Sequence, residues 1–385
     1  MLGKQESGHT LEYQLGIMRT PSLLTFAALL LAVVSGASLQ SADTGGTSSA
    51  TADEKLAIYV GLGGLNGPGR VVQLDWEAKP LGSVELPAGP EAIACRNDEL
   101  IVCPRFHSSA LFVDRNGGTG TVFDAALQVK GIRPALSRVA VHPKTGDLVF
   151  ATYSPRRTLA NEWNAAIVIV PANAPKEPRT IFLNAEATTL PGSAADFPRI
   201  GSIVVTPSGQ MLLNAGRFNG PGDAVHRFPF GEKIVFDKPF VQTKGPIAGD
   251  PSSERWAVLE SFNSSRPKIT VYENDREVGS AATVLESGAR SARIAYAPDG
   301  MLLYARDMPR KDGKLSEEKE LHVIELYSVD VTKGSFRKLG EYVHESTTKR
   351  YYQTGLDSLA IGKRLPWPAP QPAPEPTSAK ASENK

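Results

Sequence analysis

Hydrophobic residues in this sequence occur mainly in short runs, and polar or turn-forming residues separate each run from the next. In one unit, residues 203–205 precede a Thr-Pro-Ser-Gly turn, and residues 211–213 follow it. Runs this short, bounded by proline and glycine, favour β-strands joined by tight turns over helices. The charged segment 309–320 is more typical of an insertion than of a core helix. The pattern therefore predicts an all-β protein.

This strand–turn–strand unit recurs along the chain. Clear copies cover residues 139–151, 203–213 and 294–304, and looser copies cover 92–102 and 250–259. Four short strands in about 40–50 residues, with many turns, are typical of the blade of a β-propeller. The first strand of each blade lines the central channel and is covered on both sides, so it reads as a small apolar run. Six such first strands are predicted, near Ile93, Ala140, Val204, Ala248, Ala295 and Ala360.

The two ends of this body complement each other. The last first strand, at residues 355–361, has no outer strands after it, whereas the body begins with three strands at 56–60, 70–74 and 82–86. We expect these three to complete the last blade, because such pairing closes the ring and removes its free edges. The sequence thus predicts a six-bladed β-propeller. A seven-bladed ring is the alternative, because the longer spacings between units could enclose a degenerate blade.

Composition agrees with a folded, turn-rich protein. Apolar residues make up 41% of the 385 residues, and there are 35 glycines and 29 prolines. The 42 basic and 41 acidic residues give a net charge of +1. Nucleic-acid binding usually requires a clustered basic excess, so no nucleic-acid partner is expected.

The N-terminal region contains one apolar stretch, at residues 23–34. It is shorter than the about 20 residues that a spanning helix needs, and Arg19 precedes it while the small residues Ser35 and Ala37 follow it. This pattern predicts a secretory signal peptide within residues 1–37. An uncleaved membrane anchor is the alternative.

Export to the periplasm or the extracellular space follows from that signal, with no membrane span after cleavage. Met18 is a candidate for the true start, because the residues before it are polar. The propeller is expected at residues 54–365. A small polar linker at 38–53 and a proline-rich tail at 366–385 are expected to be disordered.

The cysteines and histidines show no spacing that is diagnostic of a metal site. A two-residue turn between the strands around the cysteines would place Cys95 opposite Leu100 and Cys103 opposite Ala92, with the thiols on opposite faces. This arrangement favours free buried thiols, and a disulfide is the alternative. His142 lies beside a proline in a turn and is expected to be exposed.

Charged residues precede several of the predicted first strands. In a propeller these positions and the loops between second and third strands gather at one mouth of the channel. The predicted binding residues there are Glu91, Arg138, Ser202, Arg293 and Asp357, with Arg105, Arg217 and Asn219 from the loops. Guanidiniums and carboxylates in one concave mouth could bind a small polar or anionic molecule. Alternatively, these charges pair with each other and stiffen the junctions between blades.

The strand–turn–strand units resemble the six-bladed propellers of the NHL-repeat, TolB and gluconolactonase-like group. Members of the gluconolactonase-like family hold a divalent metal, usually calcium or zinc, at the channel mouth. By resemblance, Glu91 matches the family's glutamate and Asp357 is an acidic partner. The family's asparagine has no match, because Arg138, Ser202 and Arg293 stand at the other positions.

Two functions remain open from the sequence. The first is a binding or protein-interaction module that uses the loops around the channel mouth. The second is a metal-dependent hydrolase of the lactonase type, in which calcium or zinc would be held by Glu91 and Asp357. Whether the chain is an enzyme is therefore not decided by its sequence.

Overall fold

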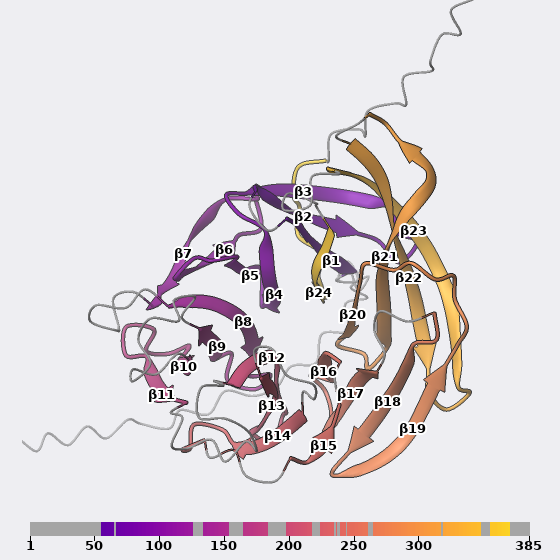
Figure 1. The fold of residues 1–385 in the computed structure, drawn as a ribbon. Helices are drawn as coiled ribbons and strands as arrows, with labels where there is room; N and C mark the ends of the chain where they lie inside the picture. Colours follow the sequence, from indigo (N-terminus) through magenta and orange to yellow (C-terminus); the bar gives the residue numbers. More distant parts are fainter. Residues whose placement is uncertain are drawn as a thin grey trace, which may run out of the picture. The chain divides into compact units, whose positions relative to one another are not determined.

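The computed structural model contains six antiparallel sheets of four strands each, arranged in a ring (Figure 1). It describes residues 55–64, 67–125, 134–153, 165–183, 198–217, 224–234, 236, 239–243, 245–260, 265–316, 319–347 and 355–369. All of them belong to the unit Thr51–Lys385. The predicted signal peptide and linker lie outside the described residues. The described part of the chain contains no helix with the length and apolarity that a membrane crossing requires.

The first three blades follow one another along the chain. Blade one is made of β4 (Pro90–Arg96), β5 (Glu99–Pro104), β6 (Ser109–Val113) and β7 (Thr119–Asp124). Blade two is made of β8 (Ala135–Val141), β9 (Leu148–Tyr153), β10 (Ala165–Val170) and β11 (Arg179–Phe182). Blade three is made of β12 (Pro198–Val205), β13 (Gln210–Arg217), β14 (Ala224–Pro229) and β15 (Val241–Gln242).

The last three blades include the one that closes the ring. Blade four is made of β16 (Ile247–Gly249), β17 (Arg255–Glu260), β18 (Lys268–Glu273) and β19 (Arg276–Ala282). Blade five is made of β20 (Ser291–Tyr296), β21 (Leu302–Lys314), β22 (Lys319–Asp330) and β23 (Ser335–Thr347). The closing blade is made of β24 (Gly355–Lys363), β1 (Leu56–Gly63), β2 (Gly69–Leu74) and β3 (Pro80–Leu86).

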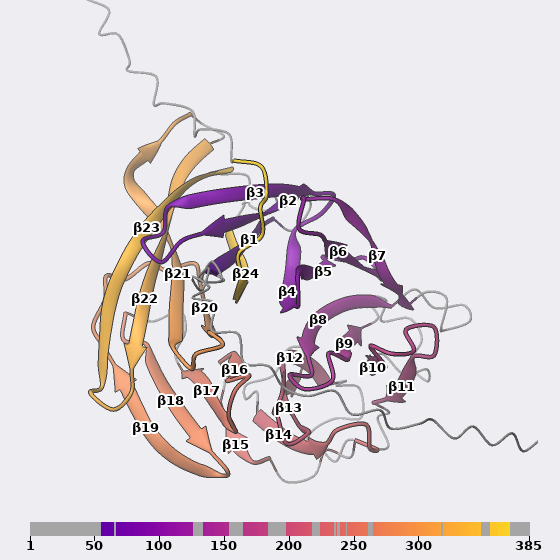
Figure 2. The same ribbon diagram turned by 180° about the vertical axis from the view of Figure 1, so that it is seen from behind.

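The closing blade joins the start and the end of the described chain. Val60 of β1 lies opposite Leu359 of β24, and Tyr59 lies opposite Ala360. Both ribbon views show β24 beside β1 on the inner side of this blade (Figures 1 and 2). The prediction of six blades closed by the N-terminal strands is confirmed, and the seven-bladed alternative is wrong.

Glycine in the left-handed backbone region forms the repeated turns between first and second strands. Gly146, Gly209 and Gly300 have φ values of 73°, 84° and 83°. Each N–H donates to a carbonyl three or four residues back, as from Gly209 to Thr206 at 3.0 Å. A residue with a Cβ is strained at such φ values. The Pro-x-Gly repeat in the sequence therefore has a conformational cause.

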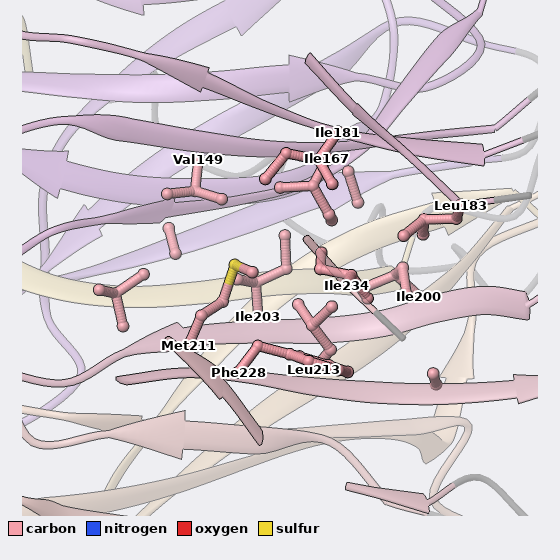
Figure 3. Close-up of a cluster of buried hydrophobic side chains, with 14 of the residues drawn as sticks. Val149, Ile167, Ile181, Leu183, Ile200, Ile203, Met211, Leu213, Phe228 and Ile234 are labelled. Atoms are coloured by element: carbon pink, nitrogen blue, oxygen red, sulfur yellow. The ribbon is translucent and has the colours of Figure 1, made fainter. Parts of the chain in front are cut away.

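Buried apolar side chains form six clusters in the described residues, and each cluster lies between two neighbouring blades. Figure 3 shows the one between blades two and three, where Val149 and Ile167 face Ile203 and Met211. Complete burial of one such side chain contributes about 1.5–3 kcal/mol to stability. The ring is therefore stabilised at every junction and forms a rigid frame around the channel.

The two cysteines are free. Cys95 lies opposite Leu100 and Cys103 lies opposite Ala92, as the sequence predicted. Cys95 packs in the cluster next to the closing blade, whereas Cys103 belongs to the cluster next to blade two. The thiols therefore lie on opposite faces of blade one, and the disulfide alternative is wrong.

The contacts of the propeller continue past Leu365, the residue at which the sequence predicted its end. Trp367 is only 5% exposed. Its indole Nε1 donates to the carbonyl of Asp114 at 2.9 Å, and its ring meets Tyr59 edge-on at 5.2 Å. The carbonyl of Pro368 accepts a hydrogen bond from the Ser83 N–H. The start of the predicted tail thus covers the closing blade, and residues 370–385 lie outside the described part.

Candidate functional site

The first strands of the six blades line one central cavity of about 930 Å³. Five of the residues predicted from the sequence lie on its wall, and they come from five different blades: Glu91, Arg138, Ser202, Arg293 and Asp357. Blade four contributes Gly245 and Pro246 at the corresponding place. We call the five polar residues the mouth residues. The structure therefore brings together side chains that are up to 266 positions apart in the sequence (357 − 91).

Both acidic mouth residues lie at β-bulges. In blade one, Pro90 pairs with Pro104 and Ala92 with Cys103, so Glu91 is the extra residue of its strand. In the closing blade, β24 skips Asp357 in the same way. A bulge turns its extra residue away from the regular alternation of the strand. Local backbone geometry thus directs both carboxylates to the mouth.

Arg105 connects the two carboxylates. Its Nη2 lies 2.7 Å from Oδ1 of Asp357, and its Nε lies 3.6 Å from Oε2 of Glu91. Arg138 contacts Glu91 from the other side, with Nη1 at 3.2 Å from Oε1. Arg105 does not line the cavity, so it supports the mouth from behind. Its backbone N–H, which donates to the carbonyl of Gly89 at 2.7 Å, fixes the start of its loop.

Three mouth residues also reach across to the next blade. Arg138 donates from Nε to the carbonyl of Gly201 in blade three. Arg293 donates from Nε to the carbonyl of Asp357 at 2.7 Å. The hydroxyl oxygen of Ser202 accepts a hydrogen bond from Ile247 N–H of blade four at 3.0 Å. These contacts agree with the alternative in which the charged residues stiffen the junctions between blades, and the uncharged Ser202 makes the same kind of contact.

Arg293 is a partly buried cation of the mouth. Burial lowers the pKa of its guanidinium to about 10, with repulsion from Arg138 adding to the effect and Asp357 opposing it. The group is therefore still charged at neutral pH. Its hydrogen bonds to described residues use Nε and Nη1, and Nη1 donates to the carbonyl of Ala292 at 2.8 Å. Within the described residues its Nη2 has no hydrogen-bond partner, so a ligand in the cavity can accept from it.

The side chain of Asp357 is largely buried in a narrow part of the wall. Burial raises the pKa of its carboxyl to about 6, although Arg105 and Arg293 both act in the opposite direction. Its Oδ2 is buried and has no hydrogen-bond partner among the described residues. A Cβ at Gly63 would lie 2.7 Å from this oxygen and 2.3 Å from the Cα of Gly89. Glycine is therefore required here for the close approach of the two chains.

The mouth residues do not fit the divalent metal expected from the gluconolactonase-like resemblance. Glu91 and Asp357 are neutralised by guanidiniums, and three cations accompany the two carboxylates. Positive charges at this distance oppose the binding of another cation. Among the described residues, neither carboxylate belongs to a group of three metal-ligating side chains. The charge balance instead suits an anion.

Two predicted residues cannot be placed. Arg217 is the last residue of β13 and pairs with Pro198, but its side chain is not among the described parts of the structure. Asn219 also lies outside the described residues.

The structure contradicts the expected exposure of His142, and it brings two other histidines together. His142 is only 7% exposed, because its ring packs edge-on against Phe230 of blade three at 4.8 Å. His322 and His344, which show no ligand spacing in the sequence, lie next to each other and to Asp307. The sequence could not show this pairing, because it depends on which residues of β22 and β23 lie opposite each other in blade five.

No protein-family model and no curated protein matches this chain. Similar solved structures include a nidogen/laminin complex, with a TM-score of 0.48 and 10% identity over 80% of this chain and 98% of the other. A gluconolactonase from Xanthomonas campestris has a TM-score of 0.39 and 12% identity over 74% and 86% of the two chains. The Dos1 propeller has a TM-score of 0.39 and 10% identity over 75% and 68%. The six-bladed fold that the resemblance implied is confirmed by the sheets of the structure itself, and these similarities say nothing of activity.

Proposed function

We propose that this protein binds a small anionic molecule at the mouth of its central channel. The observation that carries the proposal is the excess of guanidinium over carboxylate around the mouth: Arg138 and Arg293 line the cavity with Glu91 and Asp357, and Arg105 adds a third positive charge behind the two carboxylates. A guanidinium in a partly dry site binds carboxylate or phosphate through charge-assisted hydrogen bonds. The ligand would accept from Nη2 of Arg293, which faces no partner of the described chain.

The wall below the mouth adds to this proposal. It is lined by small apolar side chains from several first strands, such as Ala140, Ala248 and Ala295. An apolar wall under a polar rim is the usual composition of a small-molecule site. We therefore expect a ligand with an anionic head and a compact, partly apolar body. The metal-dependent lactonase alternative is not favoured, because the mouth lacks a suitable set of ligands for the ion.

Isothermal titration calorimetry with small carboxylates, sugar acids and phosphate tests the proposal. A charge-assisted hydrogen bond contributes about 1.5–3 kcal/mol, so Arg293→Met should weaken binding by about 10- to 100-fold. Arg293→Lys keeps the positive charge but removes the planar guanidinium, so its affinity should lie between those of the wild type and Arg293→Met. Arg337→Met, which changes an exposed arginine of β23, is the matched control. Equal affinities of the wild type and Arg293→Met, or no anion binding by the wild type, would contradict the proposal.

Export is a second part of the proposal. It is supported by the apolar stretch at residues 23–34 and the small residues Ser35 and Ala37. If the signal peptide is cleaved after Ala37, N-terminal sequencing of the secreted protein will start at Ser38. An unprocessed chain in the cytoplasmic fraction would be evidence against export.

A further inference from the structure

Asp307, His322 and His344 form a fully buried cluster away from the central cavity. They come from β21, β22 and β23 of blade five. His322 lies directly opposite His344, and Asp307 lies opposite Ile324, two residues along β22 from His322. All three side chains are 0% exposed. Since residues two apart on a strand share a face, the three side chains project from the same side of the sheet and converge.

The distances within the cluster suit one metal ion. Nδ1 of His322 lies 2.9 Å from Oδ1 of Asp307, and Nε2 of His344 lies 3.6 Å from the same oxygen. In a tetrahedral zinc site with bonds of about 2.0–2.1 Å, ligand atoms lie about 3.3 Å from one another. The two observed distances lie on either side of that value. A small shift of the side chains would therefore complete the geometry.

The outward nitrogens of both rings already have acceptors. Nδ1 of His344 lies 3.2 Å from the backbone carbonyl of Glu345, which can only accept, so this nitrogen carries the proton. Nε2 of His322 lies 3.1 Å from Oε1 of Glu320, and Arg290 donates to the same oxygen at 2.7 Å. Metal-ligating histidines characteristically donate their second N–H to a carboxylate or a carbonyl in this way.

The inward nitrogens are left without protons when both rings are neutral. Two imidazole lone pairs then point at one carboxylate oxygen of Asp307, an arrangement that a positive charge must stabilise. Nε2 of His344 is buried and has no hydrogen-bond partner in the described part of the chain. Protons on both inward nitrogens or one bound metal ion could supply the charge, and a single metal ion would satisfy both rings at once.

We propose that Asp307, His322 and His344 hold a divalent transition metal through three protein ligands, with zinc as the best match. Two imidazoles and one carboxylate are typical ligands of zinc, whereas calcium and magnesium prefer oxygen donors alone. All three side chains are completely buried, so the protein shields the site from bulk water. This proposal does not depend on the anion site at the mouth.

The experiment uses the full chain, free of any histidine tag and stripped of metal with a chelator. Isothermal titration calorimetry with zinc chloride should give one ion per chain for the wild type. Asp307→Asn and His344→Gln should each lose at least about 100-fold in affinity, and Glu320→Ala, which removes only an outer partner, should lose about 10- to 100-fold. His226→Gln, which alters a histidine that is 2% exposed in blade three, is the matched control and should bind like the wild type.

Cobalt substitution gives a second readout that does not require the variants. The wild type loaded with Co²⁺ should show the visible absorption bands of a tetrahedral site. No zinc binding by the wild type, unchanged affinity in both Asp307→Asn and His344→Gln, or a cobalt spectrum like that of the free aqueous ion would overturn the proposal. If the two variants do not fold, the wild-type cobalt spectrum alone decides between a metal site and a buried histidine–aspartate ion pair.

Discussion

The carboxylate of Asp307 accepts a hydrogen bond from the backbone N–H of Leu356, with Oδ2 3.3 Å from the nitrogen. This bond joins blade five to the start of β24, directly before the mouth residue Asp357. The hydroxyl of Ser291 donates to the Leu356 carbonyl at 2.9 Å, and Arg293 donates to the Asp357 carbonyl at 2.7 Å. Blade five thus fixes the backbone that carries Asp357 through three separate contacts. A metal ion bound by Asp307 would make that support more rigid.

The first prediction concerns closure of the ring. β24 pairs with β1 from Leu56 opposite Lys363 to Gly63 opposite Gly355. A chain that ends at residue 354 loses this strand, and β1 becomes an open edge. We expect that chain to be insoluble or to show no cooperative thermal transition by circular dichroism. A chain that ends at residue 369 keeps all the contacts described above and should melt like the full protein. Cooperative unfolding of the shorter chain would contradict the role given to β24.

The second prediction concerns Trp367. Trp367→Ala removes a ring that packs on Tyr59 and an indole N–H that donates to Asp114. Replacing a buried aromatic residue by alanine typically costs about 3–5 kcal/mol, so urea denaturation should show a loss of that order. Val284→Ala is the control, because Val284 is 73% exposed and should change stability by less than about 0.5 kcal/mol. Equal stability of the two variants would mean that the start of the tail does not support the closing blade.

The sequence predicted those features of the fold that depend on local pattern. The alternation of apolar runs and Pro-x-Gly turns determined the first strands, and the cysteine hairpin had a register fixed by its short turn. Closure could be inferred because the strands missing at one end were present at the other. Each of these inferences needs only neighbouring residues, or the requirement that no sheet edge stays open.

The sequence could not predict features that depend on contacts between distant segments. His142 looked exposed in its turn, but Phe230 of the next blade covers it. Trp367 lies among alternating prolines that favour an extended coil, and its side chain is buried because it packs against the closing blade. The histidine cluster depends on the register of β22 and β23, which shifts at a bulge between Leu326 and Tyr327. Spacing along the chain cannot show such a pairing.

The third prediction concerns the thiols. Burial raises the pKa of Cys95 to about 12 and raises that of Cys103 still further. Because the thiolate is the reactive form, a disulfide reagent at pH 8 should react very slowly with the native protein. In denaturant, two thiols per chain should react at once. Fewer than two in the denatured, unreduced protein would contradict the description of both cysteines as free.

The last prediction concerns the pH dependence of anion binding and rests on the proposed function. The pKa of Asp357 is about 6 in the folded protein, above its ordinary value near 3.9. As the pH falls through about 6, Asp357 loses its charge while Arg105, Arg138 and Arg293 keep theirs. Anion affinity of the wild type should therefore rise as the pH is lowered from 7.5 to 5. Asp357→Asn should bind more tightly than the wild type at neutral pH and show little change across this range.

Stability provides a readout of the same group that requires no ligand. Between about pH 4 and pH 6 the folded protein binds more protons at Asp357 than the unfolded chain does, so this group's contribution to stability declines as the pH rises through 6. The Asn variant lacks that decline. The difference between wild type and variant in urea denaturation therefore isolates Asp357, because the titrations of the histidines are common to both. A difference that does not vary with pH would show that Asp357 is ionised throughout. If the stability difference varies as expected but anion affinity does not, the carboxyl is correctly described and the ligand binds elsewhere.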